Sequence, residues 1–121
     1  MMFFEFNQNN SGGSFAKNDK VCHWMFIEAD SVDEANSIAE DLGCYWNGVA
    51  KDMDCECCGD RWGKAYSDEK FPLQYGDGIS FANPEEYAQF LVGEYGWFSK
   101  DEVEARVFYK DGRVVEFKGK R

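Results

Sequence analysis

The sequence predicts a single small α+β domain, with a mixed β-sheet and two helices on one face of that sheet. β-rich segments at 21–28 and 44–49 flank a helical pattern at 31–42, as in a crossover unit. A second helical pattern begins at residue 83, and two β-rich runs follow it. The predicted order is β-β-α-β-(Cys-rich loop)-α-β-β, and 121 residues (1–121) are the size of one domain.

The first two strands are predicted from aromatic and apolar content. Phe3-Phe4-Glu5-Phe6 is a short aromatic strand. The amide side chains and paired glycines of 7–14 then predict a loop. Residues 21–28 are apolar on both faces, which favours a central strand over an edge strand.

Ser31 and Glu34 form a capping-box pattern that predicts where the first helix begins. Gly43 is the residue type that ends a helix. A third strand is expected at 44–49, parallel to 21–28, because a crossover connection returns to the same sheet. The apolar stripe at helical spacing, which we expect to be buried, is Val32, Ala35, Ile38, Ala39 and Leu42.

The second half carries three further signals. A brief strand is expected at 79–81, in a turn-rich stretch. Asn83-Pro84 predicts a helix start, with Gly93 or Gly96 as its end. Asp111-Gly112 lies between the β-rich runs 103–110 and 113–118, and this predicts a hairpin.

Charge is unevenly distributed along the chain. The net charge is −10, and residues 1–60 carry three lysines against twelve carboxylates, a net −9. An acidic body repels phosphate backbones, so we expect no direct nucleic-acid binding. It suits a basic protein partner, or serves solubility alone.

No apolar run approaches the roughly 20 residues of a membrane-spanning helix. The first four residues, Met1-Met-Phe-Phe, also lack the basic start of a secretory signal. We therefore expect a soluble, cytoplasmic protein without membrane contact.

The segment 52–62 holds the most distinctive motif, Cys55-x-x-Cys58-Gly59. Two cysteines two residues apart, followed by glycine, match half of a zinc knuckle. Cys57 and Cys58 are adjacent and the total of five cysteines is odd, which favours free thiols or a metal over a disulfide framework. The motif predicts a zinc site.

Zinc takes four ligands, so the motif needs partners. We expect His23, the only histidine, to join Cys55 and Cys58, with either Cys57 or Cys44 as the fourth ligand. The alternative is that Cys22, Cys44 and His23 are ordinary core residues, because a free cysteine behaves as a small hydrophobe.

No catalytic residue and no organic cofactor site are predicted, so we expect a protein that is not an enzyme. A nucleophilic thiol needs positive surroundings. The cysteine cluster has Arg61 against four carboxylates, Asp52, Asp54, Glu56 and Asp60. The sequence also lacks a Ser-His-Asp order, a phosphate loop and a dinucleotide fingerprint.

Two further segments are candidates for binding a ligand or partner. Exposed amides and glycine N–H groups can line a polar pocket, and the loop 7–14 offers Asn9, Asn10, Gly12 and Gly13. Its alternative role is a plain connection between strands. Arg61-Trp62 is either an interface anchor, or Trp62 packs under the Cys-rich loop while Arg61 pairs with a carboxylate.

The motifs N-Q-N-N-S-G-G and C-x-C-C-G-D-R-W resemble those of small uncharacterised proteins encoded by tailed bacteriophages. The resemblance covers about the first half of the chain, through 6–13, His23, 26–29 and 55–62. It implies a viral accessory protein in the cytoplasm of a bacterial host cell. Such proteins often bind and disable a host or defence factor.

The leading hypothesis is therefore a non-enzymatic, phage-like accessory protein with one structural zinc that binds and modulates a bacterial host or defence protein. The alternative is a small-molecule binder that sequesters a nucleotide-like ligand with the Asn7–Ser14 loop. A third class is an enzyme that uses the metal as a Lewis acid, and it needs an open coordination position.

Overall fold

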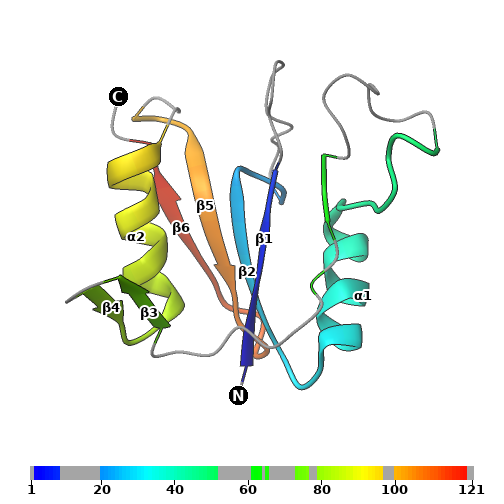
Figure 1. The fold of residues 1–121 in the computed structure, drawn as a ribbon, viewed down its shortest axis with the longest axis horizontal. Coiled ribbons are helices and arrows are strands. Elements are labelled where there is room, and N and C mark those ends of the chain that lie inside the picture. The colour runs from blue at the N-terminus through cyan, green and yellow to red at the C-terminus, as the bar shows by residue number, and fades with distance from the viewer. Residues whose placement is uncertain are drawn as a thin grey trace.

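The computed structural model describes residues 2–8, 20–51, 61–63, 65, 73–76, 79–96 and 100–119. A mixed four-stranded sheet in the order β1-β2-β5-β6 lies at its centre (Figure 1). β2 pairs antiparallel with β1 and parallel with β5, and β5 forms an antiparallel hairpin with β6. The predicted α+β class is confirmed. The elements are β1 (Met2–Asn7), β2 (Trp24–Ala29), α1 (Val32–Leu42), β3 (Leu73–Gly76), β4 (Ile79–Phe81), α2 (Pro84–Tyr95), β5 (Val103–Phe108) and β6 (Val114–Lys118).

Both helices begin and end on the residues that the sequence marks. The Ser31 side chain accepts a hydrogen bond from the Glu34 N–H, and Gly43 ends α1 with φ 125. The Asn83 side chain accepts from the Glu86 N–H, and α2 continues through Gly93 to Gly96. The predicted stripe of α1 is confirmed: two alanines are buried, and the three larger residues pack against the same core, namely Ala35, Ala39, Val32, Ile38 and Leu42.

The prediction of a strand at 44–49, parallel to 21–28, is wrong. The Cys44 N–H donates to Ala39 O at 2.9 Å, so it extends the helix cap instead of a sheet. Asn47 has φ 55, a left-handed conformation that ends an extended run. The parallel neighbour of β2 is β5, which comes from the far end of the chain. The hairpin around Asp111-Gly112 is confirmed, with Gly112 at φ 96.

The two helices cover opposite faces of the sheet, which corrects the prediction that both lie on one face (Figure 1). Side chains of a strand point alternately to its two faces. Met25 and Ile27 of β2 pack in the core under α1, whereas Trp24 and Phe26 pack in the core under α2. β2 is apolar on both faces because both faces are covered.

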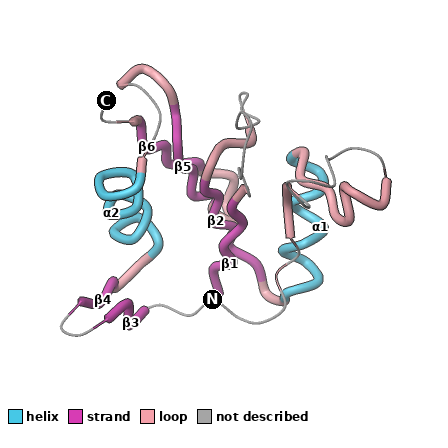
Figure 2. Tube along the Cα trace, turned by 45° about the horizontal axis from the view of Figure 1, so that its top comes forward, coloured by secondary structure: helices cyan, strands magenta, loops and turns pink. Residues whose placement is uncertain are grey.

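A second, two-stranded sheet of β3 and β4 lies beside α2, away from the main sheet (Figure 2). The predicted brief strand at 79–81 is β4, and its partner β3 was not predicted. Among the described residues, no helix is long and apolar enough to cross a membrane.

Candidate functional site

The candidate site lies at one edge of the main sheet, where β1 and β6 end and β2 and β5 begin. In Figure 1 this is the upper end of the strands. The described polar side chains that gather there are Gln8, His23, Arg61, Glu104 and Arg106, which we call the polar edge. The chain enters 9–19 from here, and it returns here at Arg61 after 52–60.

His23 is held by a buried carboxylate. Its Nδ1 lies 3.2 Å from Oε1 of Glu104, whose side chain is 0% exposed. The His23 ring also stacks on the neighbouring Trp24, with centroids 3.7 Å apart. A carboxylate acceptor favours the tautomer with the proton on Nδ1, which directs the Nε2 lone pair outward from the pair. This is the orientation that metal-binding histidines commonly have.

Gln8 links His23 to the end of the Cys-rich segment. The Gln8 N–H donates to His23 O at 3.1 Å, and its side-chain amide donates to Cys22 O at 2.9 Å. Its carbonyl oxygen accepts from Arg61 Nη1 at 3.0 Å. The side chain of one residue thus fixes Arg61 close to the segment just before β2, where His23 lies.

The two described halves of Arg61-Trp62 have different roles. Trp62 is 2% exposed and packs in the core under α1, whereas the packing alternative had placed it under the Cys-rich loop, which lies outside the described residues. Arg61 bonds the Gln8 carboxamide. A tryptophan buried in its own core is not available as an interface anchor.

Arg106 closes the polar edge on the β6 side. Its Nη1 donates to Val21 O at 3.3 Å, and its Nε donates to Glu116 at 3.0 Å. The guanidinium therefore ties the segment before β2 to β6, across β5.

Cys22 and Cys44 are free thiols in the core. Burial raises the pKa of Cys22 to about 12, against an opposing effect of Arg106. Burial also raises the pKa of Cys44 to about 12, and its Sγ lies 3.9 Å from the Met25 sulfur. Both thiols are protonated at neutral pH and behave as core residues, which was the alternative expected for them.

Several predicted site residues lie outside the described part of the chain. These are Cys55, Cys57 and Cys58 of the metal motif and Asn9, Asn10, Gly12 and Gly13 of the loop. Within the described part, no group of three or more His, Cys, Asp or Glu side chains is arranged to hold a metal ion. The structure brings His23 and Arg61 together through Gln8, and of the proposed ligands the described ones are His23 and the alternative fourth ligand, Cys44.

Sequence reasoning missed Gln8, Glu104 and Arg106. A signal for two of them was present, because Glu104 and Arg106 interrupt an apolar run at alternate positions of one strand. Charged residues on a covered strand face must be paired.

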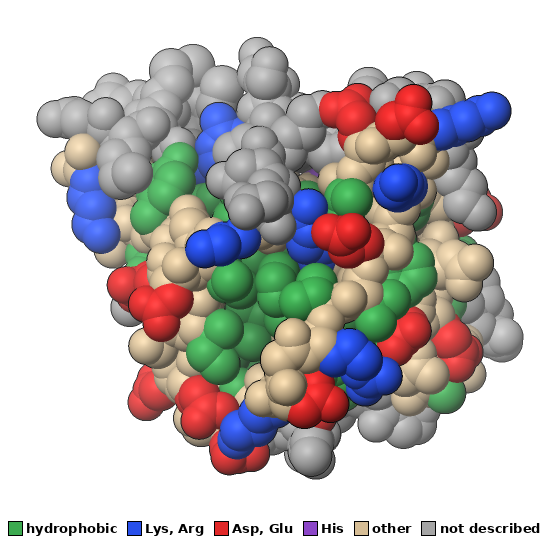
Figure 3. All heavy atoms as spheres, turned by 180° about the vertical axis from the view of Figure 1, so that it is seen from behind, with side chains coloured by type: hydrophobic (Ala, Val, Ile, Leu, Met, Phe, Trp, Pro, Cys, Tyr) green, Lys and Arg blue, Asp and Glu red, His purple; other side chains and the backbone are tan. Residues whose placement is uncertain are grey.

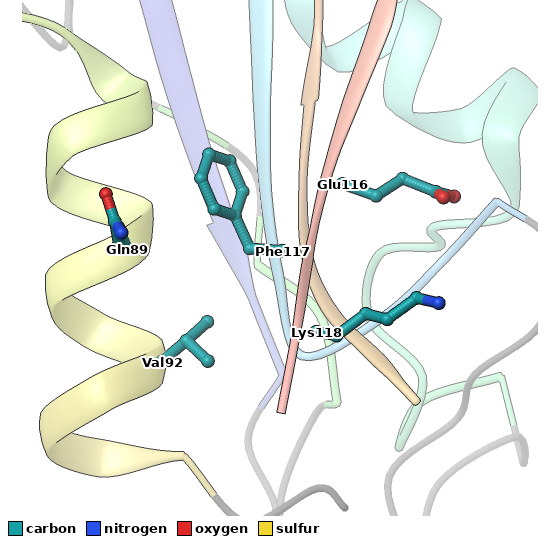
Figure 4. Close-up of a pocket in the computed structure, with 5 residues that line it drawn as sticks. All are labelled: Gln89, Val92, Glu116, Phe117 and Lys118. Carbon is teal, nitrogen blue, oxygen red and sulfur yellow. The ribbon is translucent and has the colours of Figure 1, made fainter. Parts of the chain in front are cut away.

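A separate small pocket of about 230 Å³ lies between α2 and β6 (Figure 4). Phe117 points toward α2, whereas Glu116 and Lys118 point away from it. Gln89 and Val92 of α2 supply the facing wall. The labelled side chains that face the pocket are thus an aromatic ring, an aliphatic group and an amide, which suit packing and not proton transfer.

A family model described as "Domain of unknown function (DUF7296)" matches residues 1–121. Neither a search of curated proteins nor a search of solved structures found a match. The description of the family names no activity.

Proposed function

We propose that this chain, which belongs to the DUF7296 family over residues 1–121, is a non-enzymatic binding protein with one structural zinc at the polar edge. Its partner in this proposal is a bacterial host or defence protein, and its setting is the phage-like one that the sequence motifs imply. The observation that carries the proposal is the contact between His23 and the buried Glu104.

The polar edge supports the zinc site in two ways. First, the Glu104 carboxylate on Nδ1 orients the His23 ring so that Nε2 can act as a ligand. Second, Cys58 precedes Arg61 by three residues, so their Cα atoms are no more than about 11 Å apart. Arg61 is itself fixed near His23 by Gln8, which bonds both residues.

The ligand set that fits is His23, Cys55, Cys58 and Cys57. The other candidate for the fourth ligand, Cys44, lies against Met25 in the core under α1, which disfavours it. When bound, zinc supplies folding free energy to a segment whose own apolar content is small.

The surface of α1 supports a basic protein partner. Asp33, Glu40 and Asp41 are exposed on it, and the first half of the chain has a net charge of −9. Such a surface attracts a basic partner from a distance and repels nucleic acid.

Two measurements test the two halves of this proposal. Metal analysis of protein purified without chelator should find about one zinc per chain. An affinity pull-down from bacterial lysate should recover one protein at stoichiometric amount. Recovery of no partner, together with a thermal shift on adding nucleotides, would contradict protein binding and favour the small-molecule alternative.

A further inference from the structure

A second hollow, of about 450 Å³, lies between α1 and the β5–β6 hairpin. It is at the sheet edge opposite the polar edge, where the parallel strands β2 and β5 end. Its floor is apolar, formed by Ile27, Ile38 and Phe108, and its rim carries Glu28, Glu34 and Lys110. We call this hollow the acidic groove.

The groove exists because the two helices cover different strands. α1 packs on β1 and β2, whereas α2 packs on β5 and β6 from the opposite face. The α1-side face of β6 is therefore exposed, at Val114, Glu116 and Lys118. Figure 3 shows apolar side chains between α1 and the β5–β6 hairpin, bordered by acidic and basic groups.

Glu28 is the unusual group at this rim. It is only 9% exposed and lines the groove. Among the described residues, its hydrogen-bond donor is the backbone N–H of Lys110, which bonds Oε1 at 2.9 Å. A buried carboxylate with one neutral donor is costly, and a cationic partner would stabilise it.

The other rim charges do not cancel this negative charge. The Lys110 ammonium contacts Asp30, and it lies 3.4 Å from Glu34 Oε1. The lining carboxylates Glu28 and Glu34 therefore face one lining ammonium, a net −1. Asp30 beside the rim adds a third carboxylate, and the Arg113 guanidinium over the Tyr109 ring adds a second cation, so the net charge stays at −1. A cation is the complementary group.

We propose that the acidic groove binds an arginine side chain of the protein partner. The aliphatic stem would lie on Ile27 and Ile38, and the guanidinium would pair with Glu28 beside the Phe108 ring. Arginine fits better than lysine because its guanidinium is more weakly hydrated, pairs with carboxylates through two N–H groups and stacks on rings. This inference rests on the proposed protein-binding function and is independent of the zinc site.

Two other occupants fit the groove less well. A second copy of this chain carries the same net charge of −10, so two copies repel each other. A phosphate-bearing ligand would meet the carboxylates of the rim.

The test uses the peptide acetyl-Leu-Arg-Leu-amide and its citrulline counterpart, which has the same shape without the charge. Backbone amide NMR signals of the intact protein are followed during each titration. The arginine peptide should shift the signals of Glu28, Phe108, Lys110 and Gly112, and the citrulline peptide should bind about tenfold more weakly or not at all.

The matched variants are Glu28→Gln and Glu94→Gln. Glutamine at 28 keeps an oxygen that accepts the Lys110 N–H, so the fold is retained while the charge is lost. Glu28→Gln should weaken the arginine peptide about tenfold. Glu94 is an exposed carboxylate on α2, and Glu94→Gln should leave binding unchanged.

Three results would overturn the assignment. These are equal binding of the two peptides, unchanged binding by Glu28→Gln, and groove signals that shift with protein concentration alone, as in self-association. The groove assignment and the proposed protein-binding function can fail independently of each other. If the protein recovered from lysate binds Glu28→Gln as tightly as the unsubstituted chain, protein binding stands and the groove assignment falls.

Discussion

Glu104 shows at the scale of one residue how a buried charge constrains its neighbours. Its carboxylate contacts His23 on one side and lies against Gly96, the residue that ends α2, on the other. A Cβ at Gly96 would be 2.6 Å from Glu104 Oε2 and 2.3 Å from the Val92 carbonyl oxygen. The close packing at Gly96 therefore fixes the position of the Glu104 side chain relative to the end of α2. Through its contact with Glu104, the His23 ring is positioned as well.

Gly96→Ala should destabilise the protein, because the new methyl group meets backbone as well as the carboxylate. The expected loss is about 1–3 kcal/mol in the free energy of unfolding by urea. The matched control is Gly93→Ala, three residues earlier in α2, where an added Cβ has nothing within 4 Å. That change should stabilise by about 0.5–1 kcal/mol. If the two substitutions changed the free energy of unfolding equally, Gly96 would not pack against Val92 and Glu104 as described.

The buried thiols predict alkaline sensitivity. Folding raises the pKa of Cys44 from 9.0 to about 12 because the thiol is buried. Between these values the folded state keeps its proton and the unfolded state releases it. The contribution of Cys44 to the free energy of unfolding is thus fully present below pH 9. It is lost as pH rises toward 12, by about 1.4 kcal/mol per pH unit.

Urea unfolding at pH 8, 9.5 and 10.5 measures this slope. The unsubstituted protein should lose stability more steeply with pH than Cys44→Ala does. Parallel pH profiles for the two proteins would contradict the burial of the Cys44 thiol.

At the scale of the element, α1 depends on a narrow buried stripe. Ala39 is 0% exposed in the core under the helix, whereas Ser37 lies on the exposed face. Ala39→Asp should cost about 3 kcal/mol or more, because it buries a charge in a packed core. Ser37→Asp should stay within about 1 kcal/mol. Thermal or urea unfolding compares the two, and a fully stable Ala39→Asp protein would mean that the helix packs by another face.

The elements also show what local pattern can and cannot predict. The capping residues correctly predicted where both helices begin, and Asp111-Gly112 correctly predicted the hairpin, because these signals act within a few residues. The segment 44–49 was predicted as a strand from its content alone. Its backbone instead closes the helix at Cys44 and turns at Asn47. The strand that pairs with β2 begins at Val103, and no local pattern links the two.

The same limit applies to the candidate site. The sequence indicated His23 and Arg61 by their residue types. Their partners are 81 positions away, at Glu104, and 53 positions away, at Gln8. Such pairs depend on which strands are neighbours, and the predicted sheet had the wrong neighbour for β2. A sheet with β5 beside β2 would have placed Glu104 next to His23.

At the scale of the whole molecule, the two edges of the sheet have different chemistry. The polar edge holds His23, Glu104 and Arg61 and is where we propose the zinc. The opposite edge holds the acidic groove, where we propose the contact with a basic partner. The same four-stranded sheet connects the two edges, and it is packed on one face by the core under α1 and on the other by the core under α2. Because the two sites lie at opposite edges, loss of zinc should affect the Cys-rich segment more than the groove.

The most direct test of the central claim is zinc content combined with X-ray absorption at the zinc edge. We expect about one zinc per chain, bound by three sulfurs and one nitrogen, with the nitrogen signal lost in His23→Ala. Glu104→Gln should weaken zinc binding about 10–100-fold, because the carboxylate that orients His23 is gone. The contradicting result is protein purified without chelator that contains no zinc and keeps its stability when Cys55 and Cys58 are both replaced by serine.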